Sequence, residues 1–313
     1  MNNTIFSIVV ATKDRSLHIT HFLSSLKKAG ILQRKDTEVI IIDNNSSDNS
    51  TQTICSRYKV LYALEKQIGK SYALNKGIFL ACGKYIVFTD DDAEIRDKHW
   101  LDLLYLPFKN NSRLGYVSGN VIAKSQETYA QRVWERKGGL SKGKSAKYFD
   151  SSYLQHFDFL PWPLTKICAG ANCMIPKQLL KDCGYMNTLF GPGAMIPHGE
   201  SLLIGYEIIK RGYELYYEPR AKVYHSHPKK VSTLMHKLFI YGLGDTALHT
   251  HIFLKYHDFR SLIWAFGGHQ FYVFKNLIKS FFGVYPLPPY LTFISFLGSC
   301  IGPIFFIYKW IVT

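Results

Sequence analysis

The first half of the chain alternates short apolar runs with segments of helical periodicity. Apolar runs without polar alternation occupy residues 5–11, 38–43, 60–64 and 85–89. Short runs rich in β-branched and aromatic side chains are typical of buried strands. Between them, apolar residues recur every three or four positions, as they do on one face of a helix. Strands that alternate with helices in this way predict an α/β fold with a mostly parallel sheet covered by helices on both faces.

The pattern continues with weaker signals through the middle of the chain. It predicts a helix at 99–110, a strand at 114–123, a helix at 200–211 and two short strands at 214–219 and 221–225. We assign these elements to the same α/β domain as the first half of the chain.

Two segments depart from this order and suggest the domain organisation. Residues 126–163 are rich in Lys, Gly, Ser and aromatic side chains with weak periodicity, so we interpret them as a long, partly mobile insertion. We expect one α/β domain at 1–231 and a helical region at 232–313.

The C-terminal region combines aromatic and aliphatic residues with Lys, His and Arg. Residues 260–282 show helical spacing of apolar and basic positions, which suits a membrane interface. Residues 290–308 carry no charged side chain and have about the length needed to span a bilayer, followed by Lys309 and Trp310 as interface anchors. The alternative is a buried core helix, and Gly302-Pro303 predicts a break that would divide the run into two half-length segments.

Composition narrows the class of protein. Hydrophobic residues make up 47% of the chain, which excludes a disordered protein. The formal net charge of +15 suits nucleic acid, an anionic membrane surface or a phosphorylated substrate. Because the basic residues lie beside apolar stretches and no nucleic-acid module is present, we predict a membrane surface as partner and no nucleic acid. No specific protein partner is predicted.

The cysteines and the N-terminus indicate the compartment. No CxxC pair occurs, and residues 5–11 are too short and lack the basic flank of a signal peptide. We therefore expect a protein at the cytoplasmic face of the cell membrane, peripheral or with one C-terminal segment, whose cysteines are reduced and buried. The cysteines are Cys55, Cys82, Cys168, Cys173, Cys183 and Cys300.

Three consecutive acids directly follow the predicted strand at 85–89. In an open α/β sheet, ligands bind beyond the carboxyl ends of the strands, which is where Asp90, Asp91 and Asp92 would lie. Adjacent carboxylates repel one another unless they share a cation, and such oxygen ligands suit Mg²⁺ or Mn²⁺ together with the phosphates of a nucleotide. The alternative is a solvated acidic turn that caps the next helix.

Two stretches match known sequence motifs but lack the strand and helix patterns that those motifs require around them. Residues 138–145 satisfy GxxxxGK[ST], but no buried strand precedes them and no helix pattern follows. The GLGDTA stretch from Gly242 lacks a surrounding β-α unit, so we do not interpret it as a dinucleotide site. His249 and His251 have no Cys or acid cluster beside them, as zinc would require, and are predicted to be interfacial.

Four motifs in order resemble the family 2 glycosyltransferases of the GT-A fold. They are SIVVATKDR, VIIIDNNSSD, GKSYALNKGIFLACGKYIVFTDDD and GYELYYEPRAKVYH, and the resemblance covers residues 5–227. It implies a Rossmann-like GT-A domain that transfers a sugar, with inversion, from a nucleotide-sugar donor to a glycan or lipid-linked acceptor. It also implies a divalent cation, Mg²⁺ or Mn²⁺, and a role in cell-surface polysaccharide or glycolipid synthesis.

The resemblance also implies roles for individual residues. Thr12 and Asp43 would contact the base or ribose, and Lys70 and Asn75 would line the nucleotide pocket. The acids at 90–92 would hold metal and ribose, with Asp90 and Asp91 on the nucleotide and Asp90 and Asp92 on the metal. His225 resembles the late histidine on the metal side.

The acceptor side departs from the family pattern at one position. The family places Glu-Asp at the start of the acceptor-side helix, with the Asp as base, whereas this chain has Glu200-Ser201. A serine hydroxyl does not accept a proton at neutral pH, so Glu200 is the predicted catalytic base. The alternative is a non-catalytic sugar-nucleotide-binding subunit of a membrane assembly.

Overall fold

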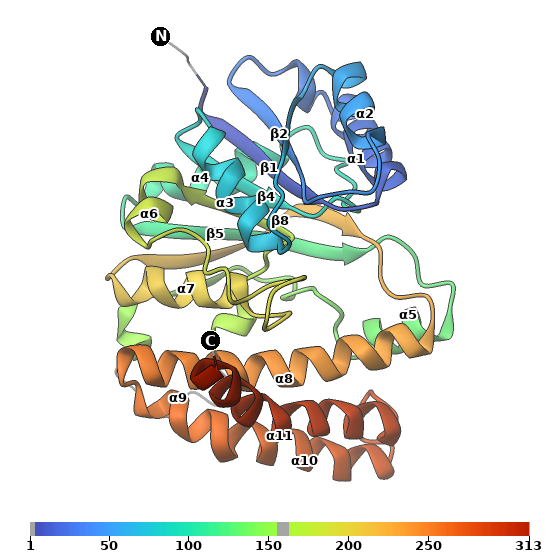
Figure 1. Cartoon of the computed structure of the whole chain (residues 1–313), viewed down its shortest axis with the longest axis vertical. Helices are drawn as coiled ribbons and strands as arrows, with labels where there is room; N and C mark the ends of the chain where they lie inside the picture. Colours follow the sequence, from blue (N-terminus) through green and yellow to red (C-terminus); the bar gives the residue numbers. More distant parts are fainter. Residues whose placement is uncertain (1–3, 155–162, 313) are drawn as a thin grey trace.

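The strands of the computed structural model form one mixed sheet. Over residues 4–154 and 163–312, which the structure describes, eight strands lie in the order β3-β2-β1-β4-β7-β5-β8-β6 (Figure 1). The strands are β1 (Phe6–Thr12), β2 (Thr37–Asp43), β3 (Leu61–Leu64), β4 (Tyr85–Thr89), β5 (Leu114–Ala123), β6 (Lys147–Phe149), β7 (Asn172–Pro176) and β8 (Glu214–His225). The strands from β1 to β4 pair in parallel, as do β5 and β8, whereas β7 runs antiparallel to both β4 and β5.

Helices cover both faces of the sheet, as the apolar pattern predicts. Phe6, Ile8 and Val10 of β1 pack in one core and Val9 packs in the other, because successive strand residues point to opposite faces. The helices are α1 (Ser16–Lys28), α2 (Ser50–Tyr58), α3 (Lys70–Leu80), α4 (Trp100–Asn110), α5 (Tyr129–Arg136), α6 (Lys177–Asp182), α7 (Glu200–Lys210), α8 (Val231–Tyr256), α9 (Phe259–Ile263), α10 (His269–Phe281) and α11 (Pro289–Val312).

The two short strands expected at 214–219 and 221–225 are one strand, β8. Its register against β5 shifts from Gly119↔Glu218 to Asn120↔Lys222. The shift leaves Pro219 outside the ladder of paired residues. Because proline has no N–H to donate, it is tolerated at such a bulge, and the strand continues beyond it. The long β8 carries the chain across the sheet to the edge where the acids lie.

The expected insertion at 126–163 is more regular than its composition indicates. It contains α5, which begins with a capping box between Thr128 and Gln131, and the edge strand β6. The prediction missed α5 because the helix is short and its buried positions include Gln131 and Trp134 beside aliphatic ones. Residues 155–162 of this segment lie outside the described residues.

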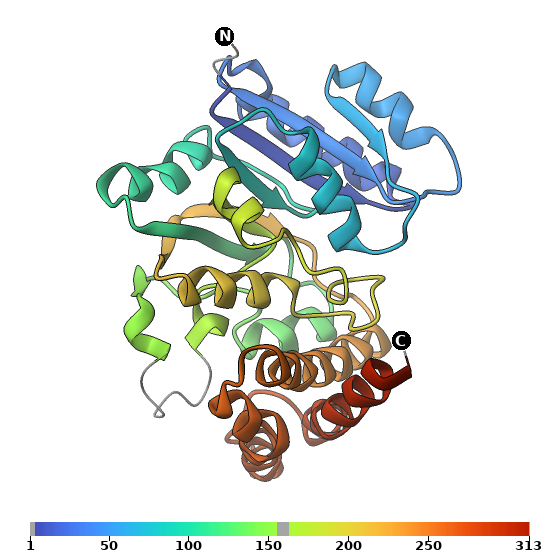
Figure 2. The same ribbon diagram turned by 60° about the vertical axis from the view of Figure 1, so that its left-hand side comes forward.

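The C-terminal helices form a separate layer below the sheet domain, with α8 between that domain and α10 and α11 (Figures 1 and 2). Helix α11 lies close against α8, since a Cβ added at Gly298 would clash with the Phe239 carbonyl of α8. The predicted break at Gly302-Pro303 is wrong, because α11 continues through it. Pro303 cannot donate to the Ser299 carbonyl, and Gln270 Nε2 donates to that oxygen instead at 2.8 Å.

The expected exposure of two histidines and the expected burial of all six cysteines are also wrong. His249 and His251 are buried rather than interfacial: His249 Nδ1 lies 3.2 Å from Ser261 Oγ, and the His251 ring packs edge-on against Phe306. The cysteines are unpaired, but Cys82 is exposed and only Cys55, Cys168 and Cys173 are fully buried.

Candidate active site

The three acids after β4 separate into different environments. Asp90 Oδ1 accepts a hydrogen bond from Lys70 Nζ at 2.6 Å. Asp91 is buried and accepts from Thr12 Oγ1 at 2.7 Å, with Arg15 Nη1 2.8 Å from its other oxygen. Burial raises the pKa of Asp91 to about 6, although Arg15 acts in the opposite direction. Protein groups therefore engage both oxygens of the middle acid.

Asp90 and Asp92 converge on His225. His225 Nε2 lies 3.0 Å from Asp92 Oδ1 and 3.2 Å from Asp90 Oδ2. The three ligand atoms lie within 4.8 Å of one another. A backbone bridge positions the histidine, since Glu94 N donates to Tyr224 O at 2.7 Å and joins the segment after the acids to the end of β8. Two carboxylate oxygens and one imidazole nitrogen are a donor set that suits Mn²⁺ or Mg²⁺.

Lys70 connects the acid cluster with the predicted base. Its Nζ lies 2.6 Å from Asp90 Oδ1 and 3.9 Å from Glu200 Oε1. Burial by itself would lower the pKa of Lys70, but the two carboxylates outweigh it and raise the pKa. The lysine is positioned at the start of α3 by Gly69, which has φ 140° and donates its N–H to Asn44 Oδ1 at 2.8 Å. Lys70 therefore stays cationic between two acids.

The other predicted donor-site residues divide into two groups. Thr12 and Asp43 are paired in register at the carboxyl ends of β1 and β2, on the same edge as the acids. Asn75 lies elsewhere: its amide is used on both sides by the Met186 backbone at 2.8 Å, and it lines a separate cavity of about 270 Å³. The structure does not bring Asn75 to the acid cluster.

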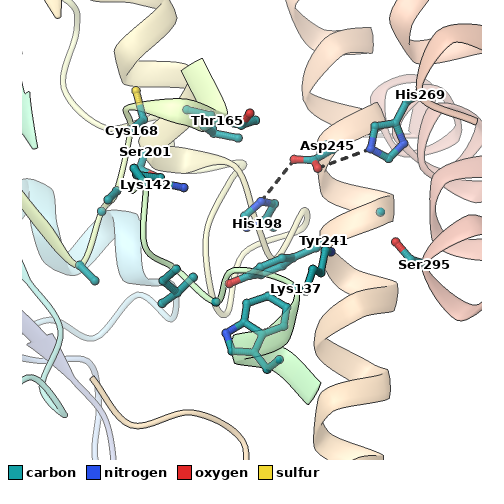
Figure 3. A pocket seen from close by; sticks show the side chains of 18 of the residues that line it. Lys137, Lys142, Thr165, Cys168, His198, Ser201, Tyr241, Asp245, His269 and Ser295 are labelled. Carbon is teal, nitrogen blue, oxygen red and sulfur yellow. Dashed lines mark ion pairs between the residues drawn. The ribbon is translucent and has the colours of Figure 1, made fainter. Parts of the chain in front are cut away.

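A cavity of about 460 Å³ is lined by residues of the sheet domain and of the C-terminal helices (Figure 3). Lys70, Asp90, Glu200 and Ser201 line one part of it. Glu200 is the first residue of α7, after Gly199 with φ 105°, and is largely buried. The metal-side acid and the predicted base thus open into one space, which is the arrangement that a transfer between two bound substrates needs.

Sequence reasoning missed three polar residues, one beside the acids and two on the cavity. Arg15 bridges Asp91 and Asp92 at 2.8 and 2.9 Å, and its place in the first motif was an available signal. Tyr241 and Asp245 of α8 line the cavity itself, which Arg15 does not. The sequence pattern that could have identified them is the four-residue spacing of polar side chains inside an apolar helix. Both residues lie outside the region that resembles the family.

Comparisons with known proteins identify relatives of the chain. The chain is 28% identical over 233 residues to the poly-beta-1,6-N-acetyl-D-glucosamine synthase of Staphylococcus epidermidis, covering 73% of this chain and 51% of that protein. The Staphylococcus aureus protein of the same name is 27% identical over 211 residues, covering 65% of this chain and 46% of that protein. The chain spans about half the length of these curated relatives.

Solved structures show the same fold at low identity. The mannosyltransferase PcManGT from Pyrobaculum calidifontis, in complex with GDP-Man and Mn²⁺, has a TM-score of 0.59 at 16% identity and covers 97% of this chain and 87% of its own. S. aureus TarS has a TM-score of 0.51 at 14% identity, with 80% and 40% covered. The family described as "Glycosyl transferase family 2" matches residues 7–184, more than half of the sequence. The chain therefore belongs to glycosyl transferase family 2.

Proposed function

We propose that the protein transfers a sugar from a nucleotide-sugar donor to an acceptor hydroxyl with inversion, in the synthesis of a cell-surface polysaccharide or glycolipid. The observation that carries this proposal is the shared cavity, in which Asp90 of the candidate metal group and the carboxylate of Glu200 face one space. The polysaccharide synthases among the relatives support the product class.

The donor side is assigned to the sheet edge. Asp90, Asp92 and His225 would hold a divalent cation, which would supply positive charge to the diphosphate leaving group. Mn²⁺ is the ion in the PcManGT complex, and the choice between Mn²⁺ and Mg²⁺ belongs to this proposal. Thr12 and Asp43 would contact the nucleoside, and Lys70 would add a second cation beside Asp90.

The acceptor side is assigned to the start of α7. Glu200 would take the proton of the acceptor hydroxyl, which then attacks the anomeric carbon in one displacement and inverts it. Lys70 Nζ lies 3.9 Å from Glu200 Oε1, so the predicted base has a cation beside it. Ser201 lines the same cavity and has no group that accepts a proton at neutral pH.

Release of nucleoside diphosphate tests the proposal. We expect the purified protein, incubated with a mixture of nucleotide sugars and Mn²⁺, to release a nucleoside diphosphate, and EDTA to stop the release. A donor that binds without turnover would support the alternative of a non-catalytic subunit. Neither binding nor release with any donor would contradict the assignment of the site.

We further propose that residues 232–313 hold the protein against the cytoplasmic face of a membrane. Among the described residues, α11 is the single helix long and apolar enough to cross a bilayer, and 39% of its most apolar window is buried within the protein. Large apolar side chains of α9 to α11 remain exposed beside Lys275, Lys279 and Lys309, a combination that suits an anionic interface. They include Phe259, Ile263, Phe266, Phe271, Phe281, Phe282, Ile304 and Ile311.

Replacing Phe281 and Phe282 together by serine is expected to weaken binding to anionic liposomes at least about tenfold. The side chains are 69% and 78% exposed, and burying one phenylalanine contributes about 1.5–3 kcal/mol. Flotation with phosphatidylglycerol vesicles measures the effect. Phe79→Ser is the matched control, because Phe79 is 76% exposed on α3, in the sheet domain. An equal loss in both proteins would contradict the assignment of this surface.

A further inference from the structure

Helix α8 carries one row of polar side chains, two of which line the cavity. Lys237, Tyr241 and Asp245 follow one another at four-residue spacing and therefore share a face of the helix. Lys237 Nζ lies 4.8 Å from the ring centroid of Trp134 and 5.4 Å from that of Tyr241. Tyr241 and Asp245 line the cavity itself.

The electrostatic surroundings show how the row is oriented. Burial lowers the pKa of Lys237, while Asp90 and Asp92 act in the opposite direction. Burial raises the pKa of Tyr241, and the carboxylates of Glu200 and Asp245 raise it further. Tyr241 lies on the cavity lining together with Glu200, and Asp245 lies one turn farther along α8, in what we call the inner part of the cavity.

Asp245 occupies that inner part between two histidines. His198 Nε2 lies 3.4 Å from Asp245 Oδ1, and His269 Nε2 lies 3.7 Å from Oδ2 (Figure 3). Burial opposes ionisation of Asp245, but the two histidines outweigh it and hold its pKa well below the ordinary value. Both contacts are longer than a normal hydrogen bond, so each carboxylate oxygen keeps acceptor capacity toward a ligand.

Aromatic rings surround the same part of the cavity. The His198 ring stacks on Tyr241 at 4.2 Å between centroids, and Trp134 meets Tyr241 at 6.0 Å and 67°. Trp134 Nε1 is buried and has no hydrogen-bond partner among the described residues. Further aromatic side chains on the lining are Trp264, Tyr272 and Tyr285.

We propose that the Tyr241–Asp245 face of α8 is the acceptor-binding wall and that the acceptor it binds is a carbohydrate. This inference rests on the proposed function. A sugar ring offers C–H groups to the aromatic faces and pairs of hydroxyls to a carboxylate. Binding sites that fix the orientation of a small ligand typically have aromatic walls and a few precisely placed polar groups. Asp245 accepts hydroxyl hydrogen bonds and orients the acceptor, with its reacting hydroxyl toward Glu200.

A hydrocarbon chain fits this lining poorly. It would remove water from the charge of Asp245 without returning a hydrogen bond, which is unfavourable for a buried carboxylate. Lys137 and Lys142 line the cavity from the side of α5, so charges on two walls would be desolvated. A lipid-linked acceptor would therefore place its sugar, not its lipid, against α8.

Calorimetric titration with a short β-1,6-linked N-acetylglucosamine oligomer tests the wall without turnover. The protein is loaded with Mn²⁺ and UDP or GDP, so that no sugar donor is present. We expect Asp245→Asn to weaken oligomer binding about tenfold or more, because hydrogen bonds to a charged group are the stronger kind. Nucleoside diphosphate binding should remain unchanged. Asp182→Asn on α6 is the control, since Asp182 is exposed and bonds only Gln178 among the described residues.

Tyr241 provides a second, independent variant. Tyr241→Phe keeps the ring and is expected to retain binding, whereas Tyr241→Leu removes the aromatic face and is expected to lose it. Oligomer binding that is equal in wild type and Asp245→Asn, or absent in the wild type, would overturn the proposal. The oligomer titration involves no turnover, so it tests the acceptor wall separately from the reaction. If the wild type releases no nucleotide from any donor, the transferase function is overturned instead.

Discussion

Replacing Glu200 by glutamine is expected to reduce sugar transfer by about 10²–10⁴-fold, the usual contribution of a general base. The amide has nearly the same shape as the carboxylate but accepts no proton at neutral pH. Donor binding should survive, because the contact between Lys70 and Asp90 at 2.6 Å does not depend on Glu200. Steady-state kinetics should show a lower kcat with a similar donor KM.

Ser201→Ala distinguishes the two candidates at the start of α7. The serine lines the cavity beside Glu200, at the position where the family pattern has its acid. If Glu200 is the base, the Ser201→Ala variant should retain transfer within a few-fold of wild type. A large loss in Ser201→Ala together with an active Glu200→Gln variant would show that the base is misassigned.

Replacing Asp92 by asparagine is expected to abolish metal-dependent donor binding. Asp92 Oδ1 lies 3.0 Å from His225 Nε2, and this oxygen is one of three ligand atoms in the candidate metal group. The amide removes a negative charge from the group, so the Coulombic attraction for a divalent cation falls while the shape is preserved. Mn²⁺ with a nucleoside diphosphate should raise the unfolding temperature of the wild type and not of the variant, since a ligand stabilises only the state that binds it.

The same exposed-acid control, Asp182→Asn, applies here and should respond to Mn²⁺ as the wild type does. Transfer assays at several Mn²⁺ concentrations provide a second readout. Full transfer by Asp92→Asn with an unchanged metal requirement would remove Asp92 from the metal group. A variant that recovers activity only at high Mn²⁺ would support the assignment.

The expected elements of the sheet domain agree closely with the structure. The apolar runs at 5–11, 38–43 and 85–89 are the buried strands β1, β2 and β4, and the helices between them lie where the periodicity predicts. These predictions hold because a strand that is buried on both faces needs an uninterrupted apolar run. The resemblance to family 2 glycosyltransferases is confirmed on the same segments.

Predictions that failed depend on contacts between distant parts of the chain. Pro303 indicated a break in α11, but Gln270 from α10 satisfies the carbonyl that proline leaves without a donor. The nucleotide-pocket role of Asn75, which the resemblance implies, stays a prediction, and its amide holds the Met186 backbone, 111 positions away. Local sequence patterns indicate backbone preference only. They do not indicate that Gln270 lies beside the Ser299 carbonyl or that Met186 lies beside Asn75.

The sequence by itself determined the strand and helix segments, the acids after β4 and the glutamate at the start of α7, because each depends on neighbours within a few residues. Only the tertiary structure decided how these groups combine. Long-range pairing of β5 with β8 brings His225 to Asp90 and Asp92, and the packing of α8 below the sheet adds Tyr241 and Asp245 to the cavity. His225 and Asp90 lie 135 positions apart in the sequence, so no local pattern specifies their contact.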